Sequence, residues 1–212
     1  MFLRNRRAMM SVLSAVLAMI FMLFFESILT MHLINDMKLS ENTAGYFFGL
    51  ICATYAISSP FVGCLTTFIA RKWLTFSAFL IAFVALLMFG PSQVLNFPNE
   101  ITLTAGGLAL LGCSCSIIFV PLLSEIIDGV RTSEGVIHSG TINDKAAGVF
   151  NTAYAVGCII APILGGYLNM YTNFRITCDT MAFSSLTYGL IFFIVIILPS
   201  FCKRSTNNSN ND

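Results

Sequence analysis

Six stretches of this 212-residue chain are almost free of charged residues over a length that can cross a lipid bilayer. A spanning helix needs about 20 mostly apolar residues, because the hydrocarbon core offers no water to an open backbone. Charged residues bound every stretch, which places the predicted spans at about 8–34, 43–69, 73–90, 101–124, 146–170 and 180–201. We therefore predict an all-α polytopic membrane protein. Residues 1–204 form one six-helix bundle, and 205–212 form a disordered cytoplasmic tail.

The composition supports the bilayer as the main partner and excludes several others. Hydrophobic residues make up 57% of the chain and charged residues 10%, against about 25% charged residues in soluble domains. The net charge is +1 without a basic run, so we expect no nucleic-acid partner. Seven cysteines lie mostly in apolar stretches and are expected to be reduced packing residues. Cys113 and Cys115 would point about 200° apart on a helix, so we expect no metal site and no cofactor.

The basic residues predict the orientation of the bundle. Nine of the eleven lie on one predicted side of the membrane, and Lys38 and Arg175 lie on the other. Because Lys and Arg stay in cytoplasmic loops, both termini are predicted to be cytoplasmic, in a plasma or vesicle membrane that the sequence does not distinguish. The nine are Arg4, Arg6, Arg7, Arg71, Lys72, Arg131, Lys145, Lys203 and Arg204.

The fifth span has the strongest packing pattern. Gly157, Ala161 and Gly165 recur every four residues, and such a flat stripe allows close approach of a neighbouring helix. Pro162 lies within the stripe and removes one helical hydrogen bond, so we expect a flexible point there. The Gly45-x-x-x-Gly49 pair of the second span is a weaker signal of the same kind.

Glu26 is the only acidic or basic side chain well inside a predicted span. A carboxylate at that depth is costly and is by default a functional candidate, so we expect it to line a cavity and carry a proton or a counter-charge. The alternative is a neutral carboxyl that hydrogen-bonds a neighbouring helix. His32 lies near the outer end of the same span, where we expect an interfacial imidazole that reaches headgroup water rather than a proton relay.

Motifs in the first two spans resemble the C-terminal half of a major facilitator superfamily transporter, and most closely its vesicular amine and polyamine branch. The segment 25–29 (Phe-Glu-Ser-Ile-Leu) resembles the acidic motif of the family's seventh helix, with Ser27 in place of a proline. The segment 55–63, which contains Pro60 and Gly63, resembles the eighth helix and its approach to the cytoplasmic gating loop. Arg71 and Lys72 match the basic pair of that loop, whose acidic residue is replaced by threonine here.

The later spans extend the resemblance. Residues 106–125 resemble the tenth helix, and 148–166 resemble the eleventh, with Ala161 in place of a glycine. Asn151 and Tyr154 match this eleventh-helix pattern, which ends in Pro-x-x-Gly-Gly, and are candidates for lining the cavity; Gly165 and Gly166 close the motif. The resemblance implies two inverted three-helix repeats, which together are half of the family's fold.

These observations favour transport over other functions. We expect a secondary antiporter of a small organic solute, such as a cationic amine, that works by proton-coupled alternating access. A missing N-terminal half or a second copy is then the expected partner, since one bundle supplies half of a midplane cavity. The alternative is a non-transporting half that assembles with or regulates another transporter. No nucleophile–base pair lies in the spans, so we do not expect an enzyme.

Overall fold

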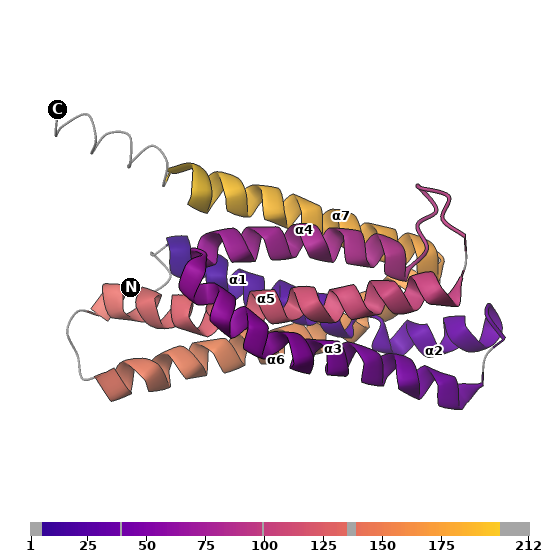
Figure 1. Cartoon of the computed structure of the whole chain (residues 1–212), viewed down its shortest axis with the longest axis horizontal. Coiled ribbons are helices and arrows are strands. Elements are labelled where there is room, and N and C mark those ends of the chain that lie inside the picture. Colours follow the sequence, from indigo (N-terminus) through magenta and orange to yellow (C-terminus); the bar gives the residue numbers. More distant parts are fainter. Residues whose placement is uncertain (1–5, 39, 99, 135–138, 200–212) are drawn as a thin grey trace.

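The computed structural model describes residues 6–38, 40–98, 100–134 and 139–199. These residues form helices and no strand (Figure 1). The predicted disordered tail at 205–212 lies outside the described residues. The elements are α1 (Arg6–Leu23), α2 (Glu26–Asn35), α3 (Glu41–Phe68), α4 (Arg71–Phe89), α5 (Ile101–Glu134), α6 (Ser139–Tyr171), α7 (Phe174–Phe192) and the π-helical segment η2 (Phe193–Ile197).

The described residues contain six helical segments that are long and apolar enough to cross a membrane. This confirms the predicted six-span, all-helical class. One segment combines α1 and α2 (Ala8–Asn35), and another combines α7 and η2 (Phe174–Ile197). The sixth helix begins at Phe174 rather than at 180, because the charged groups of Arg175 and Asp179 contact the loop between α4 and α5 and need not stay outside the helix.

The core of the bundle is built around α5. Leu108, Leu111, Ile118 and Leu122 are buried along its length, and the helix packs against α1, α3, α4 and α6. The first span contacts the fifth (α1 with α6), and the second contacts the fourth (α3 with α5). Two related three-helix units would make reciprocal contacts of this kind, which agrees with half of a major facilitator fold.

The first span is interrupted at Phe24 and Phe25, which separate α1 from α2. Both rings are buried, and they lie in an aromatic cluster with Phe89, whose centroid is 6.3 Å from that of Phe24 and 5.1 Å from that of Phe25. Neither Pro nor Gly occurs at this break. Tertiary packing therefore determines where the first span is broken, directly before Glu26.

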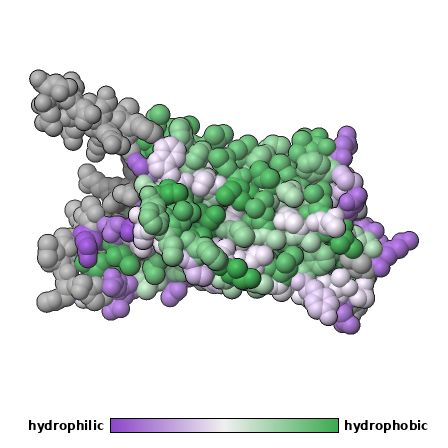
Figure 2. All heavy atoms as spheres, in the orientation of Figure 1, coloured by the Kyte–Doolittle hydropathy of each residue, from purple (hydrophilic) through white to green (hydrophobic). Residues whose placement is uncertain are grey.

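The two ends of the bundle differ in their connections (Figure 1). At one end α1 begins, α7 and η2 finish, and α3 turns into α4; we call this the α3–α4 end. The links from α2 to α3, from α4 to α5 and from α6 to α7 lie at the opposite end, called the α6–α7 end. Hydrophobic residues cover the middle of the bundle and hydrophilic ones gather at both ends (Figure 2). This distribution is typical of a protein that spans a bilayer.

Candidate functional site

Helices α3 and α6 leave a large surface uncovered within the chain. In the most apolar window of each span, 11% of the residues of α3 and 17% of those of α6 are buried, compared with 61% for α5. Both helices pack against α5 with one side and are exposed on the other. We call this exposed surface the α3–α6 face. It includes the exposed Asn151 and Tyr154 of α6 and the partly exposed Tyr55 of α3 and Cys158 of α6, and Glu26 of α2 lies beside Cys158.

Glu26 is the first residue of α2, and its side chain is exposed on this face. It lies near Cys158 of α6. Asn151 and Tyr154 precede Cys158 by seven and four residues on the same helix, so the three residues share one stripe of α6. The structure therefore brings the predicted site residues to one face, and their role in coupling stays a prediction.

An aromatic cluster extends this face toward α3 and α5. The ring centroid of Tyr154 lies 6.4 Å from that of Phe119 on α5 and 6.5 Å from that of Phe150 on α6. Tyr55 of α3 lies 6.3 Å from Phe119 on the other side. Sequence reasoning singled out Tyr154 alone, because Phe119 and Tyr55 come from helices that are distant in the sequence.

The small-residue stripe of α6 lies against the first span. A Cβ added to Gly157 would meet Met19 Cβ at 2.5 Å and the carbonyl oxygen of Val16 at 2.9 Å. A Cβ on Gly165 would collide with the carbonyl oxygen of Phe24, at the break between α1 and α2. Ala161 is fully buried between them, whereas Pro162 is exposed. The stripe is thus a close helix contact, and movement at Pro162 stays a prediction.

Other predicted packing residues have no close neighbour from another described helix. Added Cβ atoms on Gly45, Gly49, Gly63 and Gly166 would meet nothing within 4 Å. Pro60 is exposed on α3. A packing role for these positions therefore requires a surface that the described residues do not provide.

The basic pair lies at the α3–α4 end, where α4 begins. Arg71 Nη1 donates a hydrogen bond to Asp128 Oδ2 of α5 at 2.7 Å, and both side chains are partly exposed. Lys72 is half-buried beside it. An acidic partner on α5 thus pairs with the arginine, although threonine occupies the family's acidic position in the loop itself.

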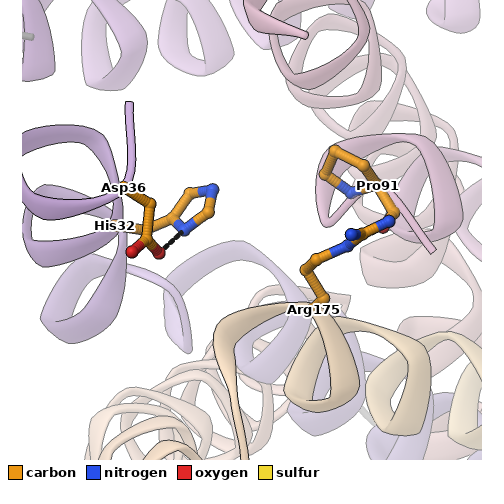
Figure 3. Close-up of polar contacts among 4 residues, drawn as sticks. All are labelled: His32, Asp36, Pro91 and Arg175. Carbon is orange, nitrogen blue, oxygen red and sulfur yellow. Dashed lines mark hydrogen bonds and ion pairs between the residues drawn. The ribbon is translucent and has the colours of Figure 1, made fainter. Parts of the chain in front are cut away.

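His32 differs from the sequence-based expectation. We expected an imidazole that reaches headgroup water, but its residue is 4% exposed. The ring stacks on Phe174 with 4.0 Å between centroids, and Nδ1 lies 2.6 Å from Asp36 Oδ2 (Figure 3). Packing of α2 against the start of α7 buries the ring, and no local pattern in the sequence indicates that contact.

Comparison with known proteins defines the chain further. A helical bundle with six candidate spans, an apolar middle and polar ends is a polytopic membrane protein. No model of a known protein family matches the chain. It is similar to MFS-type transporter SLC18B1 of Homo sapiens (25% identity over 193 residues, 89% of this chain) and of Mus musculus (28% over 190 residues, 89% of this chain).

These similarities confirm the predicted relation to the major facilitator superfamily and to its vesicular amine transporter branch. They also support a transporter function, since the relatives are named as transporters. The chain spans 41% of the length of the curated relatives it matches. That fraction agrees with the six-helix half that the fold and the motifs indicate.

Proposed function

We propose that this chain is the C-terminal half of a secondary transporter that exchanges protons for a small cationic amine by alternating access. The α3–α6 face would form one wall of the transport cavity. A second six-helix body, either an N-terminal half or a second copy, would form the other wall. The single observation that carries this proposal is the gathering of Glu26, Asn151 and Tyr154 on a face that the described part of the chain leaves uncovered.

The chemistry of this face suits a cation. A carboxylate attracts an ammonium group, and desolvation by the second body would make the charged carboxylate costly until a cation or a proton neutralises it. Binding an amine would then favour release of a proton from Glu26, which is the coupling that an antiporter needs. The rings of Tyr55 and Tyr154 can add cation–π attraction on the same face.

The test compares uptake of a radiolabelled cationic amine, such as spermidine, into proteoliposomes with an imposed pH gradient. Glu26→Gln keeps the shape but cannot change charge, so it should assemble and lose proton-driven uptake. Glu100→Gln is the matched control, because Glu100 is an exposed carboxylate directly before α5 and away from the α3–α6 face. Unchanged pH-driven uptake in Glu26→Gln would instead favour the alternative, in which Glu26 is a neutral carboxyl that hydrogen-bonds a neighbouring helix.

The same vesicles test the half-transporter proposal. The 212-residue chain alone should show no uptake while monomeric, because one bundle leaves the cavity without its second wall. Uptake should appear when an N-terminal half is co-expressed or when the chain dimerises. Stable assembly with such a partner but no uptake of any solute would favour the alternative, a non-transporting half that regulates another transporter.

We also propose that the α3–α4 end faces the cytoplasm, which follows from the nine-to-two distribution of basic residues. Reporters fused before Arg4 and after Asp212 should both read as cytoplasmic. Asn35 and Asn173 are both exposed at the α6–α7 end. Cysteines introduced at these two positions should react with a thiol label that is added outside the membrane. If either reporter gave a signal from outside the membrane, the proposed orientation would be wrong.

A further inference from the structure

A cavity of about 660 Å³ opens at the α6–α7 end, where α2, the α4–α5 loop and the junction of α6 with α7 meet. Its volume lies within the range of small-molecule sites, but its lining is mainly polar rather than apolar. Such a lining favours a polar ligand, because hydrogen-bonding groups that a ligand covers need partners. The polar side chains include four amides, one carboxylate and one guanidinium: Asn35, Gln93, Asn169, Asn173, Asp36 and Arg175.

The charges of the lining cancel. Asp36 Oδ2 lies 2.6 Å from Nδ1 of His32, whose residue is 4% exposed. Burial favours the neutral ring, so Nδ1–H donates to the carboxylate and His32 adds no charge. Its other nitrogen, Nε2, is buried, and a ligand in the cavity does not reach it. The lining therefore holds one negative group, Asp36, and one positive group, Arg175.

Each charged group already has a neutral hydrogen-bond partner. Arg175 Nε donates to the carbonyl of Pro91 and Nη2 to that of Phe97 at 2.8 Å. Figure 3 shows the guanidinium directed toward Pro91, and the pair of His32 and Asp36 across from it on α2. An anion in the cavity would meet the Asp36 carboxylate, and a cation would meet the guanidinium. The pair of charges therefore disfavours either kind of ion.

The four amides are the groups that a neutral ligand can use. None of their side chains forms a hydrogen bond within the described part of the chain, and Asn173 does not cap α7 with its side chain. Each amide offers a carbonyl acceptor and an NH2 donor group. A hydroxyl is likewise both donor and acceptor, so neighbouring hydroxyls can pair with both halves of an amide. An ion would use only one half of each.

We propose that this cavity binds a neutral polyhydroxylated ligand, a sugar or a cyclitol, either free or as the headgroup of a glycolipid. Its hydroxyls bond the amides of Asn35, Asn169 and Asn173 and the second oxygen of Asp36. Met31, which is 62% exposed in the lining, contacts the C–H face of the ring. The cavity lies at a polar end of the bundle (Figure 2), which both sources can reach. The site is independent of Glu26 and of the α3–α6 face.

Saturation-transfer nuclear magnetic resonance tests for a free ligand, with the chain in phosphatidylcholine nanodiscs. The probes are myo-inositol and methyl β-glucoside, and acetate is the charged control. We expect saturable transfer to at least one of the two polyols and none to acetate. Transfer to acetate but to neither polyol would refute a neutral site.

Native mass spectrometry tests for a lipid source. The chain is released from phosphatidylcholine nanodiscs that also contain glucosylceramide. A single retained glucosylceramide, without transfer to the free polyols, assigns the site to a glycolipid headgroup. If neither polyol receives transfer and no glycolipid is retained, the proposal is wrong.

Variants of exposed amides separate this site from general adsorption. Asn35→Leu and Asn173→Leu, on opposite walls, should keep the thermal midpoint and each weaken binding about five- to tenfold, the effect of removing one hydrogen-bond partner. Asn42→Leu is the matched control, because Asn42 is an exposed amide at the start of α3, at the same end but outside the lining. It should leave binding unchanged. Equal losses in all three variants would refute a specific site.

Discussion

Helices α5 and α3 are similar in sequence character but differ in their surroundings. They contain 34 and 28 residues, both include a proline, and both are apolar enough to span a membrane. In α5, added Cβ atoms on Gly107 and Gly112 would collide with the backbone of α4 and of α3. In α3, Gly45 and Gly49 would meet nothing. Hydropathy therefore predicts that a helix spans the membrane, and tertiary contacts decide which of its glycines are needed for the fold.

The largest expected effect is at the contact between α6 and the break in the first span. Gly165→Leu would place a side chain where a Cβ already collides with the Phe24 carbonyl, so α6 and α1 must separate. Overpacking of this kind costs about 1–3 kcal/mol or more, and we expect loss of most monodisperse protein or a clear drop in the thermal midpoint.

Gly166→Leu is the matched control for this contact, since the adjacent glycine has open space around it. It should leave the thermal midpoint of the isolated chain nearly unchanged. Equal behaviour of the two variants in detergent would show that the stripe is not a close contact.

The second effect concerns the exposed face and separates folding from assembly. The double variant Gly45→Leu and Gly49→Leu should keep the stability of the chain alone, because no atom of another described helix lies within 4 Å of either added Cβ. It should weaken association with a second six-helix body at least tenfold, measured by co-purification, if that body packs on these glycines. Unimpaired assembly would assign this surface to lipid.

A smaller effect is expected at the aromatic cluster. Tyr154→Ala should weaken amine uptake in the assembled transporter by roughly 2–30-fold, the range that corresponds to a cation–π contribution of about 0.5–2 kcal/mol. Uptake at several amine concentrations would show a raised half-saturation concentration. Tyr171→Ala is the control, because this exposed ring pairs with Tyr167 near the α6–α7 end. A similar loss in both variants would argue against recognition by the cluster.

The smallest effect is expected for the ion pair at the α3–α4 end. Arg71→Gln removes the bond to Asp128, but both groups are partly exposed and water screens them. Such pairs contribute about 0.2–1 kcal/mol, so the thermal midpoint should fall only slightly. A large fall in the thermal midpoint would show that this ion pair contributes substantially to the stability of the bundle.

The sequence was sufficient to predict the fold class, because the lengths and positions of the apolar stretches along the chain determine which segments can span a bilayer. A bilayer requires long apolar helices, so charge-free stretches revealed six spans, and the small-residue stripe of α6 revealed a close contact. The break at Phe24 and Phe25 had no local signal. It depends on the buried ring of Phe89 from α4 and on the approach of Gly165 from α6, more than 130 residues away.

The candidate site was predictable in part for the same reason. Glu26 was evident as an isolated charge in an apolar stretch, and Asn151 and Tyr154 came from the resemblance. The cavity around His32 and Arg175 was not predictable, because Arg175 donates to backbone carbonyls that any sequence possesses. A pattern of side chains cannot reveal such a contact before the fold is known.

The contacts of Arg175 make the two ends of the bundle differ in how their units are joined. The loop from Pro91 to Phe97 joins the first three-helix unit to the second, and Arg175 of the second unit holds that loop through several carbonyls. At the other end, the units are joined by the exposed ion pair of Arg71 and Asp128 and by the hydrogen bonds of Tyr188 in α7 to Ser14 and to the carbonyl of Met10 in α1. The loop between the units is therefore fixed by Arg175 at the α6–α7 end, whereas side chains on the helices themselves join the units at the α3–α4 end.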